Sequence, residues 1–160
     1  MSLPRVDPLL VPADLVARLP DLMRAAIIAA RAAEHPFGCV VADWSTGHEL
    51  FVASNSSASD STAHAEINGL REVARRGLHP RDLVLISTAE PCPMCASACW
   101  WAEIRGVVFG TSIARLIQCG FRQINLPMTD LLKTTTGGRS PIVLGAFLTE
   151  ETDLLYNKRP

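Results

Sequence analysis

The chain begins with a Pro-rich segment that leads into a helical pattern of apolar positions. Residues 1–13 are expected to form an extended arm, because prolines recur through them. Apolar side chains then repeat at helical spacing over residues 21–34, where Asp21 is a suitable N-cap and Pro36 a suitable stop. The pattern therefore predicts a first helix at 21–34.

A β-hairpin is expected next. Residues 37–42 and 49–54 read as strands, and turn residues at 45–47 join them. Beyond a polar loop the pattern alternates, in the order helix 63–76, strand 83–88, helix 91–103, strand 107–110, helix 112–119, strand 142–144 and helix 150–156. Residues 120–140 give no clear pattern. The alternation predicts one α/β domain over residues 1–160, with helices on both faces of its sheet.

Composition and charge narrow the classes of function. The chain has 160 residues, of which 48% are hydrophobic and 19% charged, and its formal net charge is −1. So small a charge does not steer nucleic acid or an anionic membrane to the protein. No run of roughly 18 apolar residues offers a membrane span. We therefore expect a cytoplasmic protein that depends on neither nucleic acid nor a membrane.

Two short motifs carry the candidate metal chemistry. His64 stands at the start of a predicted helix, and Cys92 and Cys95 form a Cys-x-x-Cys pair where a strand gives way to a helix. One imidazole and two thiolates are a ligand set suited to zinc. Helix N-termini also favour the thiolate form of cysteine. The sequence therefore predicts one zinc ion per chain, with His64, Cys92 and Cys95 as its ligands.

Glu66 is the candidate catalytic residue. Three protein ligands leave a fourth position open to water, and zinc lowers the pKa of such a water from ~16 toward ~7. A nearby carboxylate can carry the proton of that water to the substrate's ring nitrogen and to the departing amine. Glu66 follows His64 by two residues, so its side chain reaches the metal only from an irregular first turn of the helix.

Other interpretations of the same residues stay open. Cys99 lies one helical turn after Cys95, and as a fourth ligand it would close the site and make the zinc structural. The chain would then be a non-catalytic, zinc-stabilised interaction module. A redox role for the cysteine pair leaves His64 and Glu66 without a purpose. The other cysteines are expected in the core and the other histidines in solvent: Cys39 and Cys119, and His35, His48 and His79.

The order His-x-Glu followed by Pro-Cys-x-x-Cys is the signature of zinc deaminases. On these residues the chain resembles the cytidine deaminase-like superfamily, and within it the guanine deaminases, tRNA adenosine deaminases and fungal-type cytosine deaminases. The resemblance implies a three-layer α/β/α sandwich around a five-stranded mixed sheet. It also implies a homodimer whose partner subunit helps to wall the active site.

Further site residues follow from this resemblance alone. Asn55 is similar to the asparagine that hydrogen-bonds the base, and a plain turn residue is the alternative. The backbone N–H of Ala65 matches a group that contacts the substrate or the metal-bound oxygen. Trp101 resembles a guanine deaminase tryptophan and would offer a flat wall to a base, with a core or dimer-interface position as the alternative. Phe37 and Trp44 are expected to be packing residues.

The resemblance leaves several substrates open. The run Cys119-Gly-Phe121 is similar to guanine deaminases, but Arg122 stands where they carry an acidic residue. Another aminopurine, an aminopyrimidine, a triazine-like ring or a nucleoside is therefore an alternative. A tRNA adenosine is another, although the chain has only Lys133 and Lys158 as lysines for phosphate contacts. The working hypothesis is a zinc-dependent amidine hydrolase of purine metabolism that deaminates a free nucleobase, guanine above all, and releases ammonia.

Overall fold

The structure, a computed structural model, describes residues 10–157. Most of the predicted arm at 1–13 thus lies outside the described residues. The elements follow one another as α1 (Ala13–Ala32), β1 (Gly38–Asp43), β2 (Glu49–Ser54), α2 (Ala65–Arg75), η1 (Pro80–Asp82), β3 (Leu83–Ala89), α3 (Pro93–Trp101), β4 (Gly106–Thr111), α4 (Ile113–Gln118), α5 (Met128–Lys133), β5 (Ile142–Leu144), α6 (Thr149–Thr152) and η2 (Asp153–Leu155).

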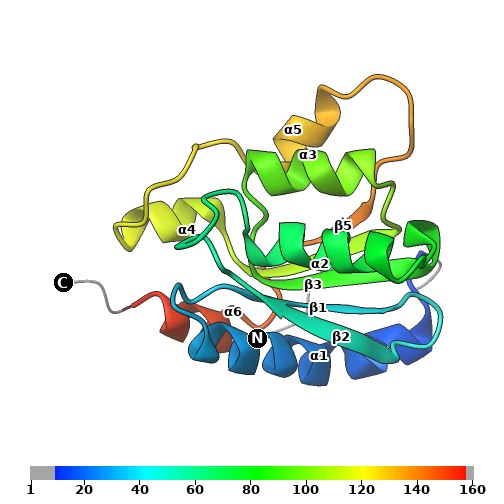
Figure 1. Cartoon of the computed structure of the whole chain (residues 1–160), viewed down its shortest axis with the longest axis horizontal. Coiled ribbons are helices and arrows are strands. Elements are labelled where there is room, and N and C mark those ends of the chain that lie inside the picture. Colours follow the sequence, from blue (N-terminus) through cyan, green and yellow to red (C-terminus); the bar gives the residue numbers. More distant parts are fainter. Residues whose placement is uncertain (1–9, 158–160) are drawn as a thin grey trace.

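The helices and the sheet form three layers. Helix α1, with α6 beside it, lies along one face of the sheet, and α2 and α3 lie on the other face (Figure 1). Each face has its own core. One joins α1 to the sheet through Leu19, Met23 and Val40, and the other joins α2 and α3 to it through Val73, Leu85 and Cys99. The predicted α/β/α sandwich is confirmed.

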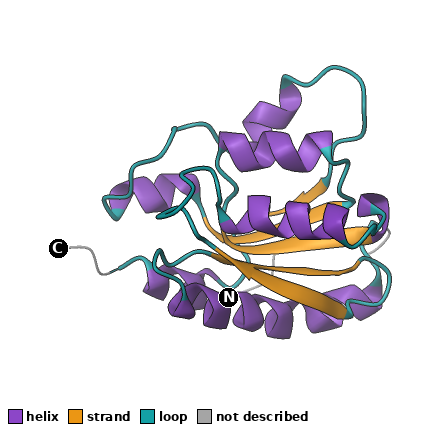
Figure 2. Ribbon diagram, viewed as in Figure 1, coloured by secondary structure: helices purple, strands orange, loops and turns teal. Residues whose placement is uncertain are grey.

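The sheet has five strands in the order β2-β1-β3-β4-β5. Strand β1 runs antiparallel to both β2 and β3, whereas β3, β4 and β5 are parallel, so the sheet is mixed as expected (Figure 2). Strands β3 and β4 are buried at every position, which explains why their sequences read as apolar runs without alternation. The segment that follows the carboxyl end of β3 carries Cys92 and Cys95, and the segment between β2 and α2 carries His64.

The first helix begins earlier than its sequence pattern predicts. The expected N-cap Asp21 lies inside α1, and the true N-cap is Pro12. Leu15 and Leu19 are fully buried and extend the apolar stripe of the helix toward its start. Their burial outweighs the cost of Pro20 inside the helix, which is about 3 kcal/mol. Packing against the sheet therefore decides where α1 begins.

Close packing of α1 on β1 depends on Gly38. A Cβ atom at this position would overlap the backbone carbonyl of Ala26 and the backbone amide of Ala30. The absence of a side chain lets the helix approach the start of the strand. This contact fixes the segment between them, which contains His35 and Phe37.

The region that gave no clear pattern contains one short helix, α5. Its first residue, Met128, is fully buried, and the N–H of Met128 donates to the carboxylate of Glu90 at 2.8 Å. This partner lies 38 positions away in the sequence, so a local pattern cannot reveal the start of α5. No helix between residues 10 and 157 combines the length and apolar character that crossing a membrane would require.

Candidate active site

His64, Cys92 and Cys95 meet at the N-termini of two neighbouring helices. His64 is the N-cap of α2, Cys92 is the N-cap of α3, and Cys95 lies in the first turn of α3. The Nδ1 atom of His64 is 3.6 Å from Sγ of Cys92 and 3.6 Å from Sγ of Cys95. All three ligand atoms lie within 4.8 Å of one another. One imidazole and two sulfurs this close together fit the donor set of a zinc site.

The backbone around Cys92 is fixed by its neighbours. Strand β3 is buried along its whole length and ends at Ala89, and Pro91 and Pro93 flank the cysteine. Pro93 is the first residue of α3, where its missing N–H costs no helical hydrogen bond. The chain therefore passes from strand to helix with little freedom, and Cys92 stays close to Cys95.

The three candidate ligands are electrostatically suited to a cation. The hydrogen bond from Cys95 lowers the pKa of the Cys92 thiol to about 4, against the opposing effect of burial. The same hydrogen bond raises the pKa of Cys95, and a hydrogen bond with Cys92 raises that of His64. Cys92 is therefore a thiolate at neutral pH. Loss of the proton on Cys95 completes the ligand set that zinc prefers.

Glu66 lies beside this group in the first turn of α2. It is 5% exposed, one of its carboxylate oxygens accepts a hydrogen bond from Ser87 Oγ at 2.9 Å, and the other accepts one from Cys95 Sγ at 3.5 Å. The first turn of the helix thus brings the carboxylate next to a candidate ligand, as its spacing from His64 requires. Burial raises the pKa of this carboxyl above its usual value, so Glu66 holds a proton more readily than a surface glutamate.

Cys99 lies outside the ligand group. Across residues 10–157, the set of three or more side chains that could hold a metal consists of His64, Cys92 and Cys95. Cys99 is fully buried in the core between α2, α3 and the sheet, as is Cys39, and burial raises the pKa of its thiol. This placement contradicts a closed site with Cys99 as fourth ligand.

A cavity of about 200 Å³ opens beside the candidate ligands. Three groups of residues line it. We call His64, Glu66, Glu90 and Cys92 the inner lining, and His35, Ser57, Arg122 and Gln123, which are half-buried or exposed, the outer lining. The others are Phe37, Asn55, Leu116 and Phe121. Pockets that bind drug-sized ligands have volumes of roughly 300–1,000 Å³. This smaller cavity therefore suits a single small ring system.

An aromatic cluster forms one wall of the cavity. The rings of Phe37 and Phe121 meet edge to face at 5.7 Å, and Tyr156 packs against both, at 5.3 Å from Phe37 and 5.5 Å from Phe121. The Tyr156 hydroxyl donates to Thr88 Oγ1 at 2.9 Å. The C-terminal segment thus supports the cavity wall from behind. Phe37 therefore packs as expected and also lines the cavity, which its sequence context did not indicate.

Glu90 positions the loop that carries the outer lining. It is 7% exposed, and its two carboxylate oxygens accept the backbone N–H groups of Ile113 at 2.9 Å and Met128 at 2.8 Å. These two bonds fix the starts of α4 and α5, between which Phe121 and Arg122 lie. The role of Glu90 was not predicted from the sequence. The only feature that could have indicated it is the position of Glu90 between a buried strand and the Cys-x-x-Cys pair.

Asn55 lines the cavity and Ala65 lies between two residues that line it, and the contacts of both with a substrate stay predictions. Asn55 lines the cavity and is 8% exposed, and its Oδ1 accepts both the N–H of Ser57 at 2.9 Å and its hydroxyl at 2.7 Å. Ala65 is the first residue of α2, so its N–H belongs to the free N-terminal end of that helix. His35, expected in solvent, is half-buried and lines the cavity.

Trp101 does not line the cavity of its own chain. It is the last residue of α3, is 76% exposed, and its ring lies 4.8 Å from that of Trp100. This exposure contradicts a core position for Trp101, whereas its role as a wall for a base stays a prediction. Its other alternative, a dimer interface, stays a prediction.

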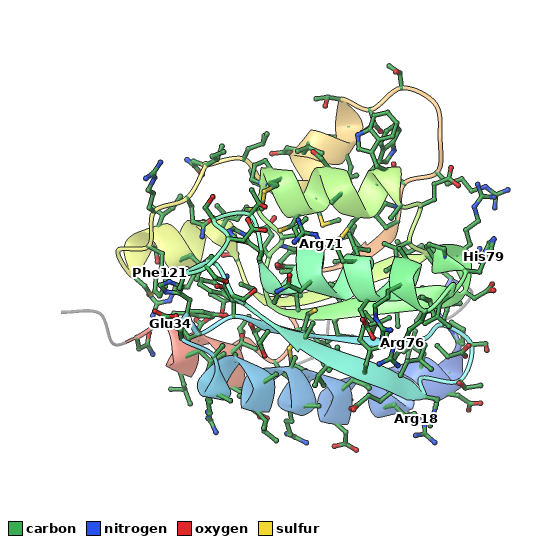
Figure 3. The ribbon with its side chains drawn as sticks, viewed as in Figure 1. Arg18, Glu34, Arg71, Arg76, His79 and Phe121 are labelled. Carbon is green, nitrogen blue, oxygen red and sulfur yellow. The ribbon has the colours of Figure 1, made fainter. Side chains whose placement is uncertain are left out.

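The cavity occupies one end of the molecule. Figure 3 shows Phe121 at the end where α4 and the C-terminal segment lie, whereas Arg18, Arg76 and His79 lie toward the opposite end. Helix α2 runs between these ends, with its N-terminus at the candidate ligands. The chemistry is therefore confined to the amino ends of α2 and α3 and to the loops around them.

Comparison with known protein families gives one match that spans most of the chain. The model described as "Cytidine and deoxycytidylate deaminase zinc-binding region" matches residues 17–111. This range begins within α1 and ends with β4, and it contains the candidate ligands, Glu66 and Asn55. The segment that carries Phe121 and Arg122 lies beyond it.

Two curated relatives show what the chain is similar to. It is 30% identical to the guanine deaminase of Bacillus subtilis over 90 residues, which are 54% of this chain and 56% of that protein. It is 38% identical to the tRNA-specific adenosine deaminase of Haemophilus influenzae over 106 residues, 63% of this chain and 58% of that protein. The chain thus spans little more than half the length of these relatives.

A solved structure has the same fold over nearly its whole length. The guanine deaminase from Nitrosomonas europaea superposes with a TM-score of 0.70, covering 98% of this chain and 96% of the other at 22% identity. At that identity the likeness shows the fold alone. The names of these relatives specify different substrates, guanine in two of them and a tRNA adenosine in the third.

Proposed function

Because the chain belongs to the family of cytidine and deoxycytidylate deaminases, we propose that it is a zinc-dependent hydrolase that deaminates a free nucleobase, guanine above all. The observation that carries this proposal is the close group of His64, Cys92 and Cys95 with the Glu66 carboxylate beside it. A purely structural zinc site does not need a buried acid with a raised pKa next to a ligand sulfur.

In the proposed role His64, Cys92 and Cys95 hold the ion. Zinc, when bound, supplies a nucleophilic water at neutral pH. In the overall reaction the water oxygen bonds to the ring carbon and the bond from that carbon to the exocyclic nitrogen breaks. One proton of the water goes to a ring nitrogen and the other to the departing amine, which leaves as ammonia.

Glu66 is the group that moves these protons. Its carboxylate is held by Ser87, so that it faces the candidate ligands and not the solvent. A raised pKa brings a carboxyl closer to the pH at which it both accepts and returns a proton efficiently. Ser87 therefore acts as a positioning residue, and Glu66 as the catalytic acid and base.

The cavity supports a flat, small substrate. Phe37, Leu116 and Phe121 offer apolar contacts, and about 200 Å³ accommodates a base more readily than a whole nucleotide. Asn55 Oδ1 accepts two hydrogen bonds, and both come from Ser57. The amide nitrogen of Asn55 is therefore left to donate to an acceptor on the substrate ring. A carbonyl-bearing base such as guanine fits this lining.

The direct test is ammonia release by the zinc-loaded chain from a panel of free bases, nucleosides and triazines. We expect guanine to give the highest kcat/KM, with xanthine formed in equal amount to ammonia. A nucleoside or a non-purine ring that exceeds guanine would refute the substrate assignment while leaving the deaminase chemistry intact.

A tRNA adenosine is the second candidate, and the 38% identity to a tRNA-specific adenosine deaminase favours it. The charges of α2 give it little support: Arg71 pairs with Asp60, and Arg75 and Arg76 share the single carboxylate of Glu72, so only one positive charge among these arginines is left without a carboxylate of its own. The test is inosine formation in an anticodon stem-loop. If that reaction exceeds the deamination of every free base, the proposal of a free-base substrate fails.

A homodimer is part of the same proposal. Trp101 is a large apolar side chain that is exposed in the single chain, and Met94 on the same helix is also exposed. Aromatic residues and methionine are enriched at protein interfaces. Seven positions separate Met94 from Trp101, so both lie on one face of the helix, and we expect that face of α3 to contact a second copy of the chain.

A further inference from the structure

Within residues 10–157, the outer lining of the cavity has no carboxylate, whereas the inner lining has two, those of Glu66 and Glu90. Both inner carboxylates have fixed donors: Glu66 accepts from Ser87, and Glu90 accepts from two backbone N–H groups. Among the residues that line the cavity, no further carboxylate is found in the described part of the chain. A substrate edge that faces the outer lining therefore meets donors and not anionic acceptors.

Arg122 is the one cation fixed into this lining by its place in the chain. It follows Phe121, which is 7% exposed and is held by the ring contacts with Phe37 and Tyr156. Within residues 10–157 Arg122 makes no ion pair, whereas Arg115, in the preceding helix, pairs with Asp153 at 3.3 Å. The backbone of Arg122 is therefore held by its neighbour Phe121, while its guanidinium is available to a ligand.

Other donors accompany Arg122. Asn55 presents its amide nitrogen, because its oxygen is held by Ser57, and Gln123 lines the same cavity. A buried donor such as the Asn55 amide, and an exposed donor such as the Arg122 guanidinium once a bound ligand covers it, select ligands that offer acceptors, since a ligand that lacks them leaves the donors unpaired. The cavity is therefore matched to a ring whose edge remote from the zinc group is rich in acceptors.

Resting on the function proposed above, we propose that Arg122 is a specificity-determining residue that donates to a carbonyl oxygen and a ring nitrogen on the substrate's outer edge. Guanine carries this pair as O6 and N7, which a guanidinium contacts with two parallel hydrogen bonds. Its amino group is at C2, across the six-membered ring. With that amino group directed at the candidate zinc ligands, the O6 and N7 edge faces outward to Arg122.

The same geometry disfavours adenine. Its amino group is attached next to N7, so directing that group inward carries the acceptor N7 inward with it. The outward edge then lacks a carbonyl oxygen. The substrate class that fits both linings is a 2-amino-oxopurine, and Arg122 provides a cation where guanine deaminases carry an acid.

The test compares rings that differ only at the outer edge. The zinc-loaded full chain is assayed for kcat/KM with guanine, with 2-aminopurine, which lacks the oxygen at C6, and with 7-deazaguanine, which lacks the N7 acceptor. The variants are Arg122→Ala and Arg122→Lys. The matched control is Arg18→Ala, which truncates an exposed arginine far from the cavity (Figure 3).

We expect Arg122→Ala to lower kcat/KM for guanine by roughly 10- to 100-fold, the discrimination of one good bidentate contact. The loss for the two analogues should be smaller, so that the preference for guanine over each falls at least about 5-fold. Arg122→Lys should give an intermediate preference, because an ammonium makes one contact where a guanidinium makes two. Arg18→Ala should change neither rate nor preference.

Each contrary result has its own meaning. If the wild-type chain deaminates guanine and its preference over the analogues is the same in both Arg122 variants, the assignment of Arg122 is wrong and the proposed function stands. If another ring is the substrate, the comparison is made with its analogue lacking the outer carbonyl, and an unchanged preference again overturns the assignment. If no ring is deaminated, both proposals fall.

Discussion

The inner and outer linings of one cavity have opposite characters. In the inner lining, His64, Glu66 and Cys92 are linked to one another or to Cys95, and Glu90 is satisfied by two backbone amides. In the outer lining, Arg122 has no ion-pair partner among residues 10–157 and lies on a loop. The first arrangement is suited to chemistry, which needs fixed geometry, and the second to substrate selection, which needs free donors.

The two linings also differ in how far the family match reaches: of the outer lining, only His35 and Ser57 lie within it. The family match covers residues 17–111 and so contains the whole inner lining. Arg122 and Gln123 lie outside it. We therefore expect changes in the inner lining to abolish turnover of every ring, and changes in the outer lining to alter the choice between rings. The following predictions test that contrast, from the largest effect to the smallest.

The largest effect is expected from loss of a candidate metal ligand. Cys92→Ser removes the thiolate whose pKa is about 4, and a hydroxyl is a poor zinc ligand at neutral pH. Zinc content, measured by elemental analysis, should fall well below one ion per chain, and kcat/KM for every ring should fall by at least about 1,000-fold. Cys119→Ser, a half-buried cysteine outside the ligand group, is the control. Retention of both zinc and activity in Cys92→Ser would contradict the ligand assignment.

A smaller effect is expected from Glu90, which joins the two linings. Glu90→Gln keeps one acceptor oxygen for Ile113 or Met128 and leaves the other N–H facing an amide. Stability in urea should drop by about 1–3 kcal/mol, the cost of an unsatisfied buried group. Glu150→Gln, at an exposed glutamate of α6, should change stability by no more than ~0.5 kcal/mol. Equal effects of the two variants would mean that Glu90 does not anchor the loop.

The next prediction concerns pH and the metal-free chain. Burial raises the folded-state pKa of Glu66 above its ordinary 4.5. The contribution of this carboxyl to stability is therefore fully present below pH 4.5 and is lost as the pH rises through the folded value. In the presence of a chelator, Glu66→Gln should gain stability relative to wild type as the pH increases. Urea midpoints measured over that range check this, and a difference that does not vary with pH would be inconsistent with a raised pKa.

The smallest effect on the single chain is expected at Trp101. Because it is 76% exposed, Trp101→Ala should change the free energy of unfolding by no more than ~0.5 kcal/mol. Sedimentation velocity should show a shift from dimer toward monomer if α3 contacts a second copy. A monomeric wild-type protein would refute the interface. A fall in kcat/KM together with dissociation would show that the outer lining includes the partner subunit.

Local patterns predicted most of the fold. The hairpin β1–β2, strand β3 and helices α2 and α4 each lie within two residues of their predicted bounds, because apolar periodicity and turn residues specify them locally. The start of α1 was wrong and α5 was not predicted. Both depend on contacts distant in sequence, the burial of Leu15 and Leu19 on the sheet in one case and the Glu90 carboxylate in the other.

The same distinction between local patterns and contacts distant in sequence applies to the candidate site. Of the inner lining, His64, Glu66 and Cys92 were found from the motifs His-x-Glu and Pro-Cys-x-x-Cys, since their ligand types and spacing are specific to one kind of chemistry, whereas Glu90 was not. The outer lining was mostly missed, because His35, Ser57 and Arg122 come from separate segments that only the folded chain brings to one cavity. Trp101 was assigned to the base through resemblance and lies outside the cavity of its chain.

The central claim is that a buried carboxylate moves protons beside a zinc ion held by three side chains. Glu66→Gln preserves the size of the side chain and an oxygen for Ser87, while removing the group that titrates. We predict that the purified variant keeps the zinc content of the wild type and releases ammonia from guanine at least about 100-fold more slowly. Wild-type turnover in a zinc-replete Glu66→Gln variant would contradict this account.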